Sequence, residues 1–342
     1  MAKKRQKTTP VEFTIRPPVV FIEEDLHSLS WCYQIHLSNR GAEPLRIVAA
    51  ETLLYDSTRL VLEEHLGRKE IRRHAKPANA ARLWFQPEKY TNWHRPVIPG
   101  NGELRWSDNF FVRPRGCWAT AVVHRFVLED AQGGRFDARC RVPLWRNRQA
   151  TRLRLPFDGW WQMLIGHEHF EHHMRGGGGM GLDFIGLCDE GAPHRGTGEQ
   201  LEDWACYRRD VRAPAAGTVV GVRNGSIDSP PGLPRSEPVN SVVLDVGNDE
   251  KVFLAHLVPG SIVVEEGDTV EPGQLLGLCG SSGYSLIPHV HVGLSRKGVG
   301  APIIFANYRL LRPLEDEPDR FSLVQTVDSG VIRHGEIVCH AG

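Results

Sequence analysis

The sequence lacks a charge imbalance, a long apolar run and a signal-peptide pattern. Among its 342 residues, 41 Lys and Arg balance 41 Asp and Glu, so no field of one sign attracts nucleic acid or an anionic membrane. No stretch reaches the roughly 18 consecutive apolar residues of a membrane-spanning helix, and we expect no transmembrane segment. The basic stretch 1–10 is not followed by an apolar segment of signal-peptide length, so the sequence as it stands predicts a cytoplasmic location.

Cysteine pairs with metal-binding or redox spacing are also missing. The seven cysteines are odd in number, and no two of them form a Cys-x-x-Cys pair. This spacing excludes the common zinc-ribbon and thioredoxin-like motifs and argues against a disulfide framework. We expect most of these cysteines to be small, buried apolar residues.

The first part of the chain has the pattern of short strands. Residues 1–10 are expected to be a disordered basic tail. In 30–39, apolar residues alternate strictly with the residues between them, which predicts a half-buried strand. Segments 117–128 and 135–144 flank a run of turn-forming residues and predict a hairpin. Residues 11–148 are therefore expected to form an immunoglobulin-like β-sandwich.

One short helix is predicted in this part of the chain. It is placed near Ser57–Arg73, where Leu62 and Leu66 stand four residues apart and Asp56 or Ser57 could cap its start. No cluster of titratable groups in 11–148 suggests chemistry. We interpret this region as a binding or positioning domain.

The second part of the chain also predicts an all-β domain. The polar, basic segment 149–154 is expected to be an interdomain linker. Residues 155–342 then contain short β-branched runs punctuated by Gly and Pro, as in compact β domains, and 226–239 is expected to be a long loop. The runs are Ala213–Val220, Ser241–Val246, Val252–Leu257 and Gln274–Leu278.

His289 and His291 are the most informative residues for function. Residues two apart on a strand project from the same face, so both imidazoles would converge on one point. Such a pair can place one metal ligand beside one group for proton transfer or oxyanion binding. The pair alone is weak evidence in a chain with 16 histidines.

Further candidate ligands lie upstream, where four histidines and a glycine run precede Asp183. This aspartate stands between Leu182 and Phe184, and a carboxylate buried there must be paired, hydrogen-bonded or metal-bound. The alternative is a solvated histidine loop with Asp183 capping a turn. The four histidines are His167, His169, His172 and His173.

Two familiar motifs are excluded in this segment. A zincin helix that starts at His167 would need a histidine at position 171, where Glu171 stands. The glycines 176–179 are not followed by Gly-Lys-Ser/Thr, so they form no phosphate-binding loop. A flexible connection that lets ligands fold back is the simpler interpretation.

Six ordered segments in the second part of the chain form a larger pattern. They are Gly181–Phe184, Ala213–Val220, Leu254–Leu257, Gly267–Gly277, Ser281–Gly283 and Pro288–His291. His256, which interrupts an apolar strand, would alone be interpreted as a core histidine, but it belongs to this pattern. On these segments, residues 155–310 resemble the lysostaphin-type, LytM-like zinc metallopeptidases, in which a His and an Asp are followed by Ala-Pro-x-x-Gly-x-Val, Tyr-Ala-His-Leu, a Gly-Gln turn and Pro-His-x-His.

The resemblance implies a β-sheet/barrel-sandwich hybrid fold (duplicated hybrid motif) and a specific set of site residues. It implies zinc held by a first histidine, Asp183 and His291, with water as the fourth ligand. His256 and His289 would be the catalytic pair that moves the proton of the attacking water and stabilises the oxyanion. The glycine run makes the spacing between the first histidine and Asp183 longer than in the family. His173 is therefore the first choice for the first zinc ligand, with His172 as the alternative.

The sequence thus predicts a zinc metalloendopeptidase that cleaves cross-link or stem peptides of peptidoglycan, or other short peptides with Gly or D-amino acids. Such a substrate would place the protein in the cell envelope or outside the cell, which conflicts with the missing signal peptide. The alternative is a non-catalytic, zinc-binding module of the same fold that binds cell wall or regulates an amidase. A biotinyl or lipoyl carrier is disfavoured because Lys251 and Lys297 do not lie in a tight hairpin.

Overall fold

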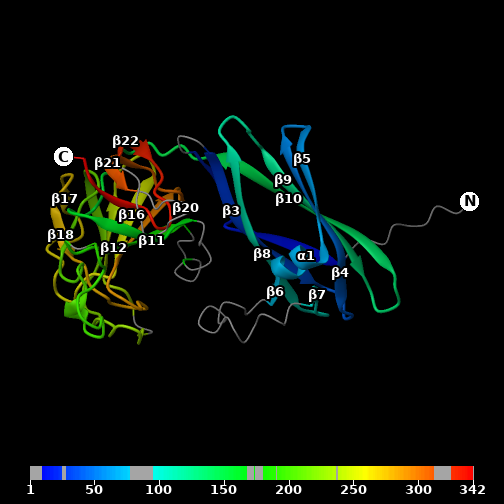
Figure 1. Ribbon diagram of the computed structural model, residues 1–342, viewed down its shortest axis with the longest axis horizontal. Coiled ribbons are helices and arrows are strands. Elements are labelled where there is room, and N and C mark those ends of the chain that lie inside the picture. Colours follow the sequence, from blue (N-terminus) through cyan, green and yellow to red (C-terminus); the bar gives the residue numbers. More distant parts are fainter. Residues whose placement is uncertain are drawn as a thin grey trace, which may run out of the picture. The chain divides into compact units, whose positions relative to one another are not determined.

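In the computed structural model the chain divides into two compact units, Met1–Arg146 and Asn147–Gly342, each described here by itself (Figure 1). Both units consist almost entirely of strands, which confirms the predicted all-β class. No helix among the described residues has the length and apolar character needed to cross a membrane. The structure describes residues 10–24, 28–77, 95–167, 173, 180–189, 191–235, 238–311 and 325–341.

Two antiparallel sheets form the first unit, and one short parallel pairing joins them. The first sheet contains β1 (Val11–Arg16), β3 (Ser28–Asn39), β8 (Glu103–Pro114) and β6 (Ala75–Pro77). The second contains β5 (Arg59–Leu66), β4 (Leu45–Asp56), β9 (Ala121–Glu129) and β10 (Arg135–Arg146), with β7 (Val97–Ile98) beside β4. Strand β2 (Val20–Glu24) pairs antiparallel with β3 and parallel with β10. This order is that of an immunoglobulin-like sandwich, as predicted.

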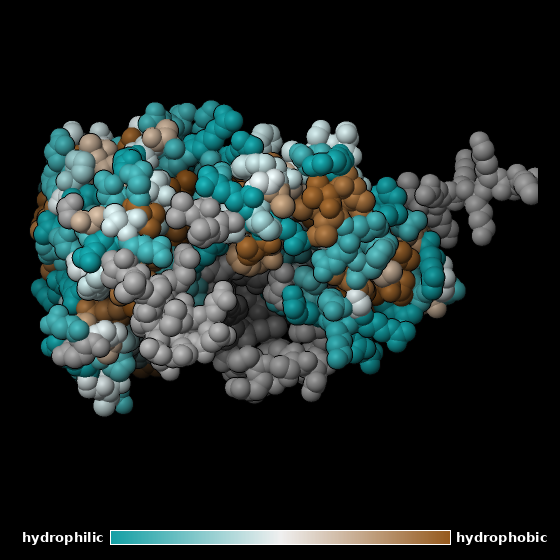
Figure 2. Space-filling model, turned by 45° about the horizontal axis from the view of Figure 1, so that its top comes forward, coloured by the Kyte–Doolittle hydropathy of each residue, from teal (hydrophilic) through white to brown (hydrophobic). Residues whose placement is uncertain are grey.

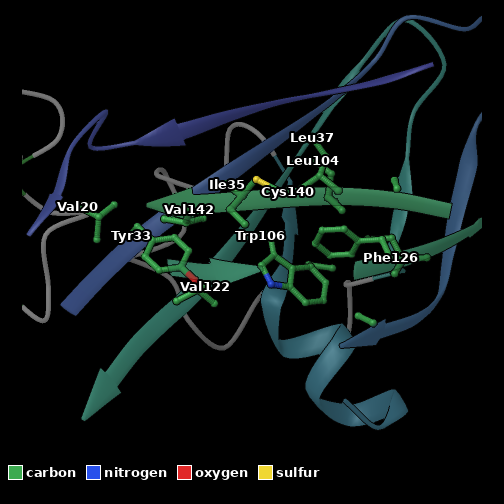
Figure 3. Close-up of a cluster of buried hydrophobic side chains, with 14 of the residues drawn as sticks. Val20, Tyr33, Ile35, Leu37, Leu104, Trp106, Val122, Phe126, Cys140 and Val142 are labelled. Carbon is green, nitrogen blue, oxygen red and sulfur yellow. The ribbon is translucent and has the colours of Figure 1, made fainter. Parts of the chain in front are cut away.

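The core of the sandwich is built from the inward faces of both sheets (Figure 3). Trp106 of β8 meets Phe126 of β9 edge to face, with ring centroids 5.0 Å apart. Each buried aromatic side chain removes about 150–250 Å² from water, which contributes roughly 4–6 kcal/mol at 25 cal/mol per Å². The predicted strand at 30–39 and the hairpin of β9 and β10 supply much of this core.

The helix predicted near Ser57–Arg73 is wrong for its first half. Residues Arg59–Leu66 form strand β5, joined to β4 by a tight turn in which Ser57 has a φ of 57°. Residues four apart lie on one side of a strand, which has a period of two, and also on one side of a helix, which has a period of 3.6. The spacing of Leu62 and Leu66 therefore fits both structures. Within the predicted range, the helical residues belong to α1 (Arg68–His74).

The second unit is one long, curled sheet with a two-stranded ribbon (Figure 1). The ribbon pairs β13 (Asp210–Arg212) with β18 (Leu275–Leu278), and the segment between β14 and β15 contains the predicted loop 226–239. The sheet contains, in spatial order, β17 (Thr269–Val270), β14 (Gly217–Arg223), β15 (Ser241–Asp245), β16 (Glu250–Ala255), β19 (Val290–Arg296), β12 (Gly181–Gly186), β11 (Trp161–Ile165), β23 (Ile337–His340), β21 (Phe305–Leu311) and β22 (Gln325–Gly330), with β20 (Val299–Ala301) beside β19.

The segment expected to be a linker, 149–154, packs on the second unit. The backbone N–H groups of Ala150 and Thr151 donate to the fully buried carboxylate of Glu250, over 2.8 and 2.9 Å. Leu153 forms a parallel bridge with Phe305, and both side chains are fully buried. This segment therefore contributes to the core of the second unit.

The surface of both units mixes hydrophilic and hydrophobic residues on the face that Figure 2 shows. In the first unit, Leu60 of β5 and Val112 of β8 are among the exposed large apolar side chains, and in the second unit Leu233 is 69% exposed. Scattered apolar residues of this kind are normal for folded proteins.

Candidate metal and catalytic site

Two neighbouring strands at the middle of the second unit's sheet place Asp183 opposite His291. Strand β12 pairs antiparallel with β19, and these two residues are direct cross-strand partners. Side chains of directly opposite residues lie on the same face of the sheet. The Nδ1 atom of His291 lies 2.8 Å from Oδ1 of Asp183, although the two residues are 108 positions apart.

His173 completes a group of three possible metal ligands. Its Nε2 atom lies 3.1 Å from Oδ2 of Asp183, and its ring centroid lies 4.8 Å from that of His291. The ligand atoms of these three residues all lie within 4.8 Å of one another. Ligand atoms around a tetrahedral zinc ion lie roughly 3.4 Å apart, given metal–ligand distances of about 2.0–2.2 Å. The two imidazoles and one carboxylate thus fit a zinc ion in both type and spacing.

His256 and His289 stand beside this group. Their ring centroids are 4.3 Å apart, and Nε2 of His289 lies 3.6 Å from Oδ1 of Asp183. Each imidazole directs Nδ1 at a backbone carbonyl: His256 at that of Ser282 and His289 at that of Ile287, both over 2.7 Å. A carbonyl only accepts hydrogen bonds, so both Nδ1 atoms carry a hydrogen. In the neutral form of either ring, Nε2 is then the hydrogen-bond acceptor.

The electrostatics of the site favour an ionised Asp183 and a neutral His256. Burial alone would raise the pKa of Asp183, but the charges of His289 and His173 and hydrogen bonds from His173 and His291 hold this pKa well below its ordinary value. For His256, burial is the largest cause that lowers the pKa well below its ordinary value, and His289 and His291 add to it. At neutral pH the site therefore combines an anionic ligand with a neutral base.

The structure brings five predicted site residues into one place. His173, Asp183, His289, His291 and His256 surround the same point on the sheet, and His289 and Asp183 are 6% and 2% exposed. His172, the alternative first ligand, and His169 lie outside the described residues. His167 is buried and does not belong to the three-ligand group.

Sequence reasoning missed residues that shape the site without carrying titratable groups. Gly181 is one of them: a Cβ atom there would lie 2.2 Å from Cε1 of His291 and 3.2 Å from Cγ of His173. Only glycine leaves room for the two rings at this position of β12. Its place two residues before Asp183 was the one signal in the sequence that could have identified it.

A second group of possible ligands, in the first unit, is exposed on the sandwich. Glu51, Glu63 and His65 lie on β4 and β5, with ligand atoms within 4.8 Å of one another. The Arg125 guanidinium lies 2.9 Å from a Glu51 oxygen and competes for that carboxylate. This group therefore has the features of an ordinary surface charge cluster.

Residues 198–302 match the family model of peptidase family M23, so the second unit contains a domain of that peptidase family. This domain has the lysostaphin-type β fold. The matched segment includes His256, His289 and His291, whereas His173 and Asp183 lie before it. Asp183 is joined to the matched segment by the pairing of β12 with β19.

The chain is also similar to chains of solved structures. A chain of the SpoIIQ–SpoIIIAH pore-forming complex is 21% identical, with 35% of this chain and 59% of that chain covered and a TM-score of 0.25. The catalytic domain of the antimicrobial peptidase lysostaphin from Staphylococcus simulans is 23% identical, with 36% and 77% covered and a TM-score of 0.23. A zinc containing peptidase from Vibrio cholerae is 14% identical, with 85% and 84% covered and a TM-score of 0.29. No curated protein matches the chain.

Proposed function

We propose that the second unit is a zinc-dependent metalloendopeptidase. The observation that carries this proposal is the convergence of Nε2 of His173, the carboxylate of Asp183 and Nδ1 of His291 beside two imidazoles that present Nε2. Three protein ligands leave one position open for water, which is the arrangement of catalytic rather than structural zinc sites. The peptidase family M23 match supports the same class of reaction.

His173, Asp183 and His291 would hold the zinc ion. When bound, zinc would lower the pKa of its water ligand to about 7 and polarise a substrate carbonyl. Nε2 of His173 and Nδ1 of His291 both lie within hydrogen-bond distance of the Asp183 carboxylate, so the three ligand groups face one another. To hold zinc, both nitrogens would be unprotonated.

His256 and His289 would do the proton chemistry. Their Nε2 atoms accept hydrogen bonds, so one of the two can take the proton of the attacking water. The imidazolium formed in this way can donate a hydrogen bond to the oxyanion of the tetrahedral carbon, or return the proton to the leaving amine. The carbonyls of Ser282 and Ile287 hold both rings in the required tautomer.

The substrate class that we propose is short peptides of peptidoglycan, either cross-link or stem peptides. This assignment depends on the resemblance to lysostaphin-type enzymes in the segments around His256 and His291. For the first unit we propose a binding or positioning role, because its immunoglobulin-like fold is joined to a unit that contains the whole candidate site.

The test compares zinc content with peptide hydrolysis. Zinc-loaded protein is expected to contain about one zinc per chain and to release free amines from purified sacculi. Asp183→Ala should lose both properties, whereas Asp249→Ala, which removes an exposed aspartate of the same unit, should keep both. Wild-type protein with one zinc per chain and no hydrolysis of sacculi or of stem peptides would contradict the peptidase and favour a non-catalytic module.

A further inference from the structure

His256 leaves its strand in an unusual backbone conformation. Strand β16 ends at Ala255, and His256 has a φ of 65°, in the left-handed region that residues other than glycine rarely adopt. Its backbone carbonyl accepts from Gly280 N–H, and its Nδ1–H donates to the Ser282 carbonyl over 2.7 Å. The direction in which Nε2 points is therefore set by the loop that follows β18.

The Ser282 side chain fixes this loop to the residue after His256. Its hydroxyl donates to the Leu257 carbonyl over 2.9 Å and accepts from the Asn240 backbone N–H over 3.1 Å. Ser282 and Asn240 are both fully buried, with 0% exposure. The same serine thus contacts the catalytic segment twice, once through its carbonyl at His256 and once through its hydroxyl at Leu257.

The Asn240 side chain closes the network. Its Nδ2 donates to the carbonyls of Leu257 and Ser226, over 3.0 and 2.6 Å, and its Oδ1 accepts from Ser226 N–H over 2.8 Å. The two amide donors and one acceptor site are all used, as expected for a buried amide that specifies one geometry. The carbonyl of Leu257 consequently receives two hydrogen bonds, one from Asn240 and one from Ser282.

We infer that Ser282 and Asn240 are positioning residues that hold His256 with Nδ1 protonated and Nε2 directed at the candidate site. This inference rests on the proposed function, in which His256 takes part in peptide hydrolysis. The described hydrogen bonds of both residues go to Ser226, His256, Leu257 and each other, and none goes to a proposed zinc ligand. Both act through His256, by fixing the carbonyl that its ring needs and the backbone that follows it.

The chain offers a matched control at the adjacent position. Ser281 lies in the same loop and is also 0% exposed, but its hydroxyl has no hydrogen-bond partner among the described residues. Ser281→Ala and Ser282→Ala remove the same atom from neighbouring positions with equal burial. Only Ser282→Ala removes an atom of the network.

The experiment measures kcat, KM, zinc content and the ring tautomer of His256. For Ser282→Ala we expect kcat to fall about 10-fold or more, with KM within about twofold and zinc content unchanged, whereas Ser281→Ala should match wild type. In ¹⁵N NMR spectra of the full chain, wild type and Ser281→Ala should show His256 protonated at Nδ1. Ser282→Ala should shift it towards a tautomer mixture.

A double-mutant cycle separates positioning from a general structural role. In a His256→Ala background, Ser282→Ala should cause no further loss of kcat, because the two substitutions remove one shared function. An equal loss of kcat in both backgrounds, or equal kcat and equal tautomer in Ser281→Ala and Ser282→Ala, would overturn the inference.

Asn240→Asp, which keeps the shape of the side chain but loses both amide donors, should show the same tautomer shift as Ser282→Ala. If wild type hydrolyses no peptide, the proposed function fails, and the NMR comparison still decides whether the network sets the tautomer.

Discussion

His289 and His291 are neighbours in sequence but differ in which ring nitrogen they use. Nδ1 of His291 faces Asp183, whereas Nδ1 of His289 donates to a backbone carbonyl. His291→Ala should therefore reduce zinc content towards zero. His289→Ala should keep about one zinc per chain and lower kcat by about 10²- to 10⁴-fold, the usual range for a lost acid or base. Metal analysis and peptide hydrolysis check this, and equal zinc content in both variants would contradict the two roles.

Gly181 limits what the metal site tolerates, because its missing Cβ leaves the space that the His291 ring fills. Gly181→Ala should lower zinc content several-fold with an unchanged far-UV circular dichroism spectrum, since its backbone conformation suits alanine. Gly225→Ala is the matched control, because nothing lies within 4 Å of a Cβ at that position. Zinc content equal to wild type in both variants would show that the rings can move away at no cost.

Single residues also show how far the sequence alone could predict the site. Asp183, His256, His289 and His291 could be identified because their residue types and order follow a family pattern. His173 was a choice among four histidines, since spacing along the chain does not say how a glycine run bends. Ser282 lies in a segment of that pattern, but its role in the hydrogen-bond network could not be predicted, because backbone hydrogen bonds depend on which loops meet in the fold.

At the scale of elements, alternation predicted strands well where one face is buried. The hairpin of β9 and β10 is an example, because its period of two leaves no other amphipathic interpretation. Strand β3 lies where alternation predicted it, but it is buried on both faces from Leu29 to Ile35 and not half-buried as expected. Strand β5 failed because a spacing of four fits both helix and strand. The pairing of β12 with β19 could not be predicted from either strand alone. Strand β12 is buried on both faces and so shows no alternation, and partners far apart in sequence are selected by packing.

Strands β3, β4 and β9 meet at a buried histidine that should make the sandwich sensitive to acid. His124 is 1% exposed; its Nε2 lies 2.6 Å from the Tyr33 hydroxyl, and its Nδ1 lies 3.3 Å from the Thr52 hydroxyl. Burial is the main cause that lowers the pKa of His124 to about 3, with a smaller contribution from His74. In the unfolded chain the pKa of His124 is the ordinary value of about 6.5. Between about pH 3 and 6.5, His124 therefore binds a proton in the unfolded state and not in the folded state.

Stability of the sandwich should therefore fall as pH falls below about 6.5, by about 1.4 kcal/mol per pH unit down to about pH 3. Above about pH 6.5 the full contribution of His124 to the stability of the sandwich is present, because His124 binds the extra proton in neither the folded nor the unfolded state. His124→Gln should remove that part of the slope, whereas His65→Gln, at a histidine whose side chain is 70% exposed, should leave it. Urea unfolding followed by hydrogen exchange of β3, β4 and β9 measures this, and identical slopes in all three proteins would refute the assignment.

At the scale of the whole molecule, the candidate ligands and both catalytic histidines belong to the second unit. Composition and motif order predicted two β domains, but the boundary between them depends on contacts that a sequence does not display. The polar segment around Ala150 has the composition of a linker, yet its backbone N–H groups satisfy the buried Glu250 carboxylate. A linker and a segment that donates hydrogen bonds to a buried carboxylate can have the same composition, and only their contacts in the fold distinguish them.

The end point of a truncation should therefore decide whether the second unit works alone. A fragment of residues 147–342 keeps the hydrogen-bond donors to Glu250 and the bridge from Leu153 to Phe305. We expect this fragment to bind about one zinc per chain. It should also cleave a soluble peptide with kcat/KM within about threefold of the full chain. A fragment of residues 155–342 leaves a fully buried carboxylate without those donors, which costs about 3–5 kcal/mol, so it should unfold at lower urea concentration and bind less zinc. Glu250→Gln in the longer fragment controls for the charge, and equal urea midpoints for the two fragments would show that residues 147–154 are a linker after all.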